Sequence, residues 1–172
     1  DNITYAYDRA SLNSGVLDEF AYSDEEKELV RTYGYIGGNV HTDLHECLGH
    51  GSGKMLPGVG QEALKNYYST IEEARADLFA LYYVMDPKLV ELGVISSLEV
   101  AKSEYCNYIR NGLMVQLTRV KFGNNLEESH MRNRQLIASW VYEKGKADNV
   151  IERVSRDGKT YFTIRDYEAL RK

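Results

Sequence analysis

Apolar residues recur every three or four positions along most of this chain, which is the spacing of amphipathic helices. Leu78, Leu81, Tyr82 and Met85, for example, form one apolar stripe. The first 22 residues show no sustained period, and we expect them to be irregular. The pattern predicts helices over residues 24–35, 39–49, 61–67, 70–85, 97–122, 126–144 and from 167 onward.

Capping and helix-breaking residues set the expected ends of these helices. Ser23 and Glu26 form a capping box at the start of the first helix. The glycines at positions 34, 37 and 38 should end that helix, and Pro87 should end the one over 70–85. Further along, Gly112 permits close packing or a kink. The expected core side of the 126–144 helix is Leu136, Ile137, Trp140 and Val141.

The pattern changes near the C-terminus. Residues 150–156 and 159–164 flank Asp157-Gly158, a dipeptide typical of a two-residue β-hairpin turn. Asp166 then caps a last helix. The predicted fold is therefore mainly α: a multi-helical subdomain with a small C-terminal β-hairpin, formed by residues 1–172 as one domain.

The composition limits the compartment and the partners that we expect for this protein. A net charge of −5 gives no reason for attraction to nucleic acid or to an anionic membrane. No apolar run approaches the roughly 20 residues of a membrane span. Two cysteines in 172 residues do not make a disulfide framework. We therefore expect a reducing compartment, the cytoplasm, with no nucleic-acid or membrane partner.

The candidate chemistry centres on His45-Glu46-Cys47-Leu48-Gly49-His50. Imidazole nitrogens ligate zinc, and a neighbouring carboxylate can take a proton from water at the metal. The two histidines are five residues apart, so on a regular helix they would lie roughly 140° apart around the axis. The helix must therefore bulge or end between them, where Gly49 tolerates unusual backbone angles.

A third ligand is expected from the acidic segment that starts the 70–85 helix. Glu73 and Asp77 lie one turn apart on one face, so one can bind metal while the other orients a ligating histidine. The spacing alone leaves Glu72 as an alternative to Glu73. Two histidines, one glutamate and a water form a catalytic rather than a structural zinc site. His41, one turn before His45, is expected to be an ordinary surface or core histidine.

These two motifs resemble those of the dipeptidyl peptidase III family of zinc metallopeptidases. The family combines H-E-x-x-G-H with a later E-E-x-R-A-[E/D], and this chain has both. A third match is His130-Met131-Arg132-Asn133-Arg134. The resemblance runs from about the N-terminus to Arg134 and beyond.

The resemblance implies a role for each matching residue. The metal site would hold one Zn²⁺ per chain through His45, His50 and Glu73. The general base would be Glu46, and His130 and Arg134 would stabilise the transition state and bind substrate. Glu72 and Asp77 would be hydrogen-bonded partners of His50 and His45. The implied activity is removal of dipeptides from the N-terminus of short peptides.

Family members are several-fold longer and have two lobes, so the resemblance implies that this chain is the central part of the helical, zinc-carrying lobe. The partners would then be a short peptide substrate and the remaining lobe. We expect the isolated chain to be weakly active or inactive. Two alternatives stay open: another zinc peptidase with a different cleavage mode, and a zinc-binding helical module without turnover. Uncovered apolar surface could also drive self-association.

Overall fold

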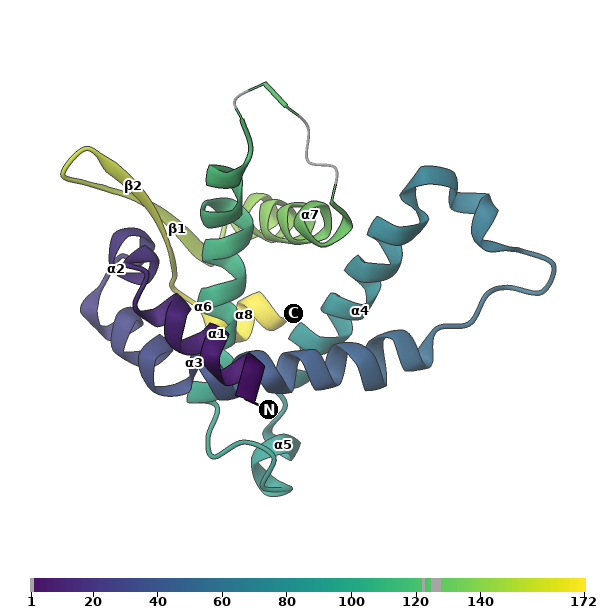
Figure 1. Ribbon diagram of the computed structural model, residues 1–172, viewed down its shortest axis with the longest axis horizontal. Coiled ribbons are helices and arrows are strands. Elements are labelled where there is room, and N and C mark those ends of the chain that lie inside the picture. Colours follow the sequence, from purple (N-terminus) through teal and green to yellow (C-terminus); the bar gives the residue numbers. More distant parts are fainter. Residues whose placement is uncertain (1, 122, 125–127) are drawn as a thin grey trace.

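The computed structural model describes residues 2–121, 123–124 and 128–172. Over these residues the chain is mainly helical with a small antiparallel hairpin near the C-terminus, which confirms the predicted fold class (Figure 1). Its α-helices and strands are α1 (Asn2–Leu12), α2 (Val16–Phe20), α3 (Asp24–Leu44), α4 (Tyr68–Val84), α5 (Pro87–Glu91), α6 (Glu99–Leu113), α7 (Ser129–Lys144), β1 (Ile151–Arg156), β2 (Lys159–Ile164) and α8 (Tyr167–Arg171).

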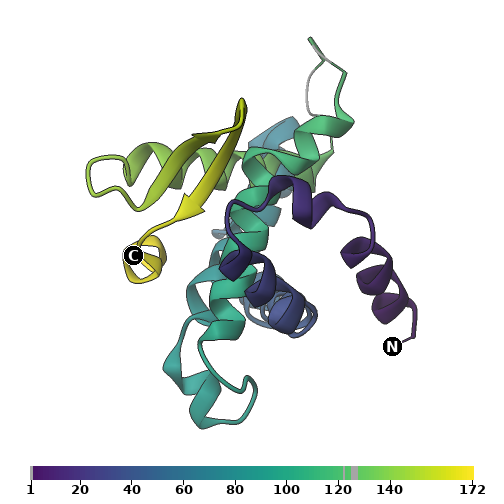
Figure 2. The ribbon, with the colours of Figure 1, turned by 90° about the vertical axis from the view of Figure 1, so that its left-hand side faces the viewer.

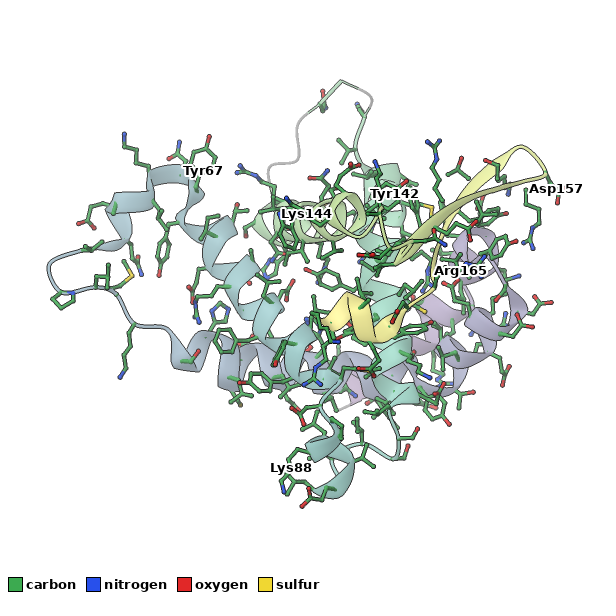
Figure 3. All side chains as sticks on the ribbon, turned by 180° about the vertical axis from the view of Figure 1, so that it is seen from behind. Tyr67, Lys88, Tyr142, Lys144, Asp157 and Arg165 are labelled. Carbon is green, nitrogen blue, oxygen red and sulfur yellow. The ribbon has the colours of Figure 1, made fainter. Side chains whose placement is uncertain are left out.

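Four short helical segments of other types complete the list. They are a π-helix η1 (His45–Gly49) and the 3₁₀ helices η2 (His50–Ser52), η3 (Gln61–Tyr67) and η4 (Val115–Arg119). The segment between η2 and α4 projects from the body of the molecule, and Tyr67 lies where this segment joins α4 (Figure 3).

Helix α6 lies at the centre of the core. It packs on α3 near its N-terminal end and on α7 near its C-terminal end, while α4 packs on α3 and α7 (Figure 1). The most buried side chains of α6, among them Val100, Ala101 and Ile109, join one apolar cluster with residues of α3 and α4. This arrangement places η1, which continues α3, beside α4, and α4 beside α7, so that the segments that carry the predicted site meet.

The prediction that glycines end the first helix was wrong, because α3 continues through all three of them and into η1. Gly37 faces α6, and a Cβ there would lie 3.0 Å from the carbonyl oxygen of Val100. The glycine therefore serves a close helix contact. The Ser23 half of the predicted capping box is confirmed, because Ser23 Oγ accepts the Glu26 N–H. The Glu26 carboxylate reaches back one residue further than a capping box requires and accepts the N–H of Tyr22.

The first 22 residues also differ from expectation, since they form α1 and α2. Leu17 is buried and Leu12 packs against the same core, so a few apolar contacts order two short helices that lack a clear sequence period. Tertiary contacts often decide such segments.

Helix α6 ends at Leu113, well before the predicted end, and η4 follows. The predicted end at 122 and the predicted start of the next helix at 126 lie outside the described residues. On α7, Leu136 and Trp140 are 46% and 59% exposed, so two of the four residues expected on the core side lie at the surface. The face buried against α4 and α6 runs instead through Asn133, Ile137 and Ala138.

The predicted hairpin is confirmed. Ile151 pairs with Ile164, and the register continues to Arg156 and Lys159 around the turn. Asp157 and Gly158 both have positive φ, at 53° and 76°, as a two-residue turn of this kind requires. The hairpin lies beside α7 (Figure 2), where the rings of Phe162 and Tyr142 meet edge to face at 5.1 Å.

Asp166 caps α8 by accepting the N–H of Ala169, which confirms the predicted cap. No helix among residues 2–121, 123–124 and 128–172 is long and apolar enough to cross a membrane.

The contact between α6 and α7 gives a stability prediction. A Cβ on Gly112 would lie 2.6 Å from Ala138 Cβ and 2.7 Å from the Arg134 carbonyl oxygen. Gly112→Ala should therefore push α7 away and lower the free energy of unfolding by about 1–3 kcal/mol. Urea denaturation measures this change.

Gly38→Ala is the matched control, since nothing lies within 4 Å of a Cβ at that position in α3. There alanine should raise stability by about 1 kcal/mol through helix propensity alone. Equal effects of the two substitutions would contradict the close contact.

Candidate metal centre

The five-residue spacing of the two motif histidines is accommodated by a change of helix type. Helix α3 passes into the π-helix η1, and the N–H of His50 donates to the carbonyl oxygens of His45 and Glu46. A π-helix brings residues five apart onto one face. The predicted bulge between His45 and His50 is therefore confirmed.

Gly49 is needed at this bulge for a reason that the sequence does not show. A Cβ at position 49 would lie 2.7 Å from both Cα and Cβ of Ala76, so the π-turn lies directly against α4. Arg75 strengthens this contact, because its guanidinium donates to the carbonyl oxygen of Gly49 and to Ser52 Oγ. The acidic start of α4 is thereby held beside the histidines.

Three imidazole nitrogens converge on one carboxylate oxygen, Glu73 Oε2. The Nε2 atoms of His45 and His130 each lie 3.2 Å from it, and that of His50 lies 3.7 Å away. His45 Nε2 and His50 Nε2 are themselves 3.0 Å apart. The structure thus brings together residues from η1, η2, α4 and α7 that span 86 positions of sequence.

Each of these imidazoles has its other nitrogen on a second carboxylate. The pairs are His45 Nδ1 with Asp77 (2.7 Å), His50 Nδ1 with Glu72 (3.0 Å) and His130 Nδ1 with Glu128 (2.8 Å). A carboxylate at Nδ1 fixes the tautomer of a histidine and makes its Nε2 a better ligand. The Nε2 atoms of His45 and His50 therefore face the shared centre with their lone pairs available.

Arg75 also acts on the carboxylate behind His50. It donates two hydrogen bonds to Glu72, and these, with the His50 contact, lower the pKa of Glu72 to about 2. The Glu72 hydrogen bond in turn raises the pKa of His50. Arg75 thereby holds the Glu72 carboxylate in the position from which it contacts His50 Nδ1.

Asp77 lies on the buried side of the site, with 3% of its surface exposed. One oxygen accepts from both His45 and His41, and the other accepts from Tyr108 at 2.8 Å. Burial opposes ionisation of Asp77, but these donors outweigh it and hold its pKa at about 2.

His41 was expected to be an ordinary histidine, but it is buried between two carboxylates. Its Nε2 lies 3.0 Å from Asp77 Oδ1 and its Nδ1 lies 3.2 Å from Glu104 Oε1. Burial opposes its protonation, yet the two acids outweigh that effect and raise the pKa of His41 to about 9.

Glu46 and Arg134 lie on the more open side. The Glu46 side chain is exposed, and it offers an oxygen that lies within 4.8 Å of ligand nitrogens of both His45 and His50. Arg134 is half-buried, and its guanidinium makes no hydrogen bond or ion pair within the described part of the chain. His130 also faces this side, with 49% of its side chain exposed.

The donor set fits a metal ion. Glu73 Oε2 is buried and accepts no hydrogen bond from the described residues, although three imidazoles surround it. Ligands about 2.0–2.2 Å from a tetrahedral zinc lie roughly 3.3–3.5 Å from one another. The separations among His45, His50 and Glu73, at 3.0, 3.2 and 3.7 Å, bracket that value.

Sequence reasoning missed four polar residues around the site: His41, Glu104, Tyr108 and Glu128. Glu128 had a visible signal, since it stands two residues before His130 and its side chain caps α7. The helical spacing of His41 and His45 was another signal. Glu104 and Tyr108 come from α6, whose contacts with His41 of α3 and Asp77 of α4 could not be read from local sequence.

The close contact at Gly49 generates a prediction about metal binding. Gly49→Ala should force the π-turn away from Ala76 and separate His45 and His50 from Glu73. Zinc affinity should fall by the roughly 10–100-fold that loss of a supporting partner costs. Competition with a chromogenic chelator measures that affinity.

Gly51→Ala is the matched control, because a Cβ there makes only an ordinary 3.4 Å contact with the Glu46 carbonyl oxygen. If both variants bound zinc as tightly as the unchanged chain, the π-turn would not set the ligand geometry.

No protein-family model matches the sequence. The chain is 26% identical over 156 residues to dipeptidyl peptidase 3 of Mus musculus, a match that covers 72% of this chain and 21% of that protein. It is 25% identical over 177 residues to dipeptidyl peptidase 3 of Homo sapiens, covering 84% of this chain and 23% of the human protein. The chain thus spans about a fifth of the length of the curated relatives it matches, and the similarity suggests a region related to dipeptidyl peptidase 3.

Proposed function

We propose that this chain is the metal-binding part of a zinc peptidase that releases dipeptides from the N-terminus of oligopeptides. The observation that carries the proposal is the convergence of three imidazole Nε2 atoms on the buried, unbonded oxygen of Glu73. The similarity to two mammalian dipeptidyl peptidases supports the cleavage mode.

We assign the ligands as His45, His50 and Glu73. Two imidazoles and one carboxylate are a typical ligand set of catalytic zinc, which keeps a fourth position for water or substrate. When bound, zinc would supply a Lewis acid and lower the pKa of water toward about 7. The carboxylates of Asp77 and Glu72 would keep the two ligating rings in place.

The remaining roles follow from exposure and position. Glu46 would act as the general base, because its carboxylate is exposed and lies beside both ligating histidines. It would take a proton from water and pass it to the leaving amine. His130 would donate from Nε2 to the oxyanion that develops at the scissile carbonyl. Arg134, whose guanidinium is unpaired within the described chain, would bind a substrate carbonyl or carboxylate.

The substrate would be a short peptide, and a further lobe would complete the cleft. Cutting after the second residue requires a group that binds the free N-terminal amine, and we assign none among the described residues. We therefore propose that the 172-residue chain alone is weakly active or inactive. We also propose a cytoplasmic location, in keeping with two unpaired cysteines.

A second candidate is a zinc-binding module without turnover. It is favoured by one observation, that His130 Nε2 lies as close to Glu73 Oε2 as His45 Nε2 does. As a fourth ligand, His130 would close the coordination sphere, and closed sites are structural. The third candidate is a zinc peptidase with a different cleavage mode.

Zinc content is the first test. The unchanged chain should hold about one zinc after dialysis against excess metal, because three ligands are already in place. Glu73→Ala should lose it, whereas Glu91→Ala, an exposed change on α5, should not. Inductively coupled plasma spectrometry measures the ratio. A folded chain that takes up no zinc would contradict the proposal.

His130→Ala in the same measurement separates the two candidates. A catalytic His130 leaves zinc affinity nearly unchanged, whereas a fourth ligand takes a large part of the affinity with it.

Product analysis on a tetrapeptide tests the cleavage mode. At high chain concentration with zinc, we expect slow release of the N-terminal dipeptide, abolished in Glu46→Gln while zinc stays bound. Mass spectrometry identifies the products. Release of single residues would support another zinc peptidase, and rapid dipeptide release would contradict the proposed weakness of the isolated chain.

A further inference from the structure

A buried line of polar side chains lies behind the candidate metal centre. It runs from Glu104 on α6 to His41 on α3, then to Asp77 on α4, Tyr108 on α6 and Asn133 on α7. All five residues are buried. The line therefore joins the four helices that carry or support the site.

We propose that His41 is a positioning residue for His45: held by Glu104, it fixes the Asp77 carboxylate that accepts the Nδ1–H of His45. This inference rests on the proposed function, because His45 matters through its Nε2. It assigns His41 a role beyond that of an ordinary core histidine.

The first argument is the shared oxygen. Asp77 Oδ1 accepts from His45 Nδ1 at 2.7 Å and from His41 Nε2 at 3.0 Å. A buried carboxylate without enough donors rotates or draws in water, since an unsatisfied buried charge costs several kcal/mol. Tyr108 fixes the other oxygen. With Tyr108 at one oxygen and both histidines at the other, the plane of the Asp77 carboxylate is fixed, and loss of His41 would remove one of these three donors.

The second argument is that the His41 ring is itself fixed. It stacks on Tyr108 with ring centres 5.8 Å apart and on His45 with centres 6.2 Å apart. Its Nδ1 lies 3.2 Å from Glu104 Oε1. A ring that contacts two other rings, donates a hydrogen bond from Nε2 and is paired with the Glu104 carboxylate at Nδ1 can transmit position, as a partner of a metal ligand must.

His41, His45 and Asp77 also offer atoms close enough together to hold a metal of their own. Hydrogen bonds already use the facing atoms of all three, at 2.7 and 3.0 Å. A metal there would take the lone pair of His45 Nδ1 and leave the ring proton on Nε2, so a neutral His45 could not also ligate a metal beside Glu73. Positioning is therefore the role that is compatible with the centre at Glu73.

The test compares His41→Leu, which removes both contacts, with His41→Gln, whose amide can still donate to Asp77. Val84→Ala, a core truncation at the far end of α4, is the control for lost stability. Two readouts are used. Long-range ¹H–¹⁵N correlation reports the tautomer of His45 in the metal-free chain, and chelator competition reports zinc affinity.

We expect His45 to be protonated at Nδ1 in the unchanged chain and in His41→Gln, and to become a mixture of tautomers in His41→Leu. Zinc affinity should fall about 10–100-fold in His41→Leu, be largely rescued in His41→Gln and stay unchanged in Val84→Ala. If His41→Leu did not fold, Glu104→Gln should show the same changes in smaller measure.

An unchanged His45 tautomer and unchanged affinity in His41→Leu would overturn the inference, as would an equal loss of affinity in Val84→Ala. Failure of the proposed function has a different signature. In that case the unchanged chain binds no zinc, while the tautomer readout in the metal-free chain still decides the role of His41.

Discussion

The contact between the π-turn and α4 is the constraint on which the rest of the site depends. The turn presents His45 and His50 on one face, and its approach to Ala76 is so close that position 49 has no room for a side chain. That close contact fixes the position of α4 relative to the two histidines. Glu73 then reaches the centre, while Glu72 and Asp77 reach the outer nitrogens of the rings.

Charge balance explains why so many acids can gather here. Glu72 is neutralised by Arg75, and Asp77 is satisfied by two imidazoles and a phenol. Glu73 differs, because its inner oxygen is buried among nitrogens without a hydrogen bond. A cation at that point would supply the missing partner. Metal binding would therefore also add to the stability of the fold, since only the folded chain assembles the ligands.

Much of this arrangement follows from the sequence, but not all of it. The bulge was predictable because the spacing of His45 and His50 is incompatible with a regular helix. The hairpin and the caps at Ser23 and Asp166 were predictable because each rests on a few adjacent residues. Continuity of α3 and the exposed face of α7 were not, because they depend on which distant helix packs there. The same limit hid Glu104, whereas the roles assigned to the site residues stay predictions.

The site is closed at the back and open at the front, and this asymmetry bears on its reactivity. His45 and Asp77 are buried, whereas Glu46 is exposed and His130 is half in water. An interaction between charges is several times weaker in water than in a partly buried site. The groups to which we assign proton transfer and oxyanion binding would therefore interact weakly with a substrate until another part of the protein covered the front. Under the proposed function, metal binding would rely on the closed back, so the chain would bind metal well and still turn over substrate poorly.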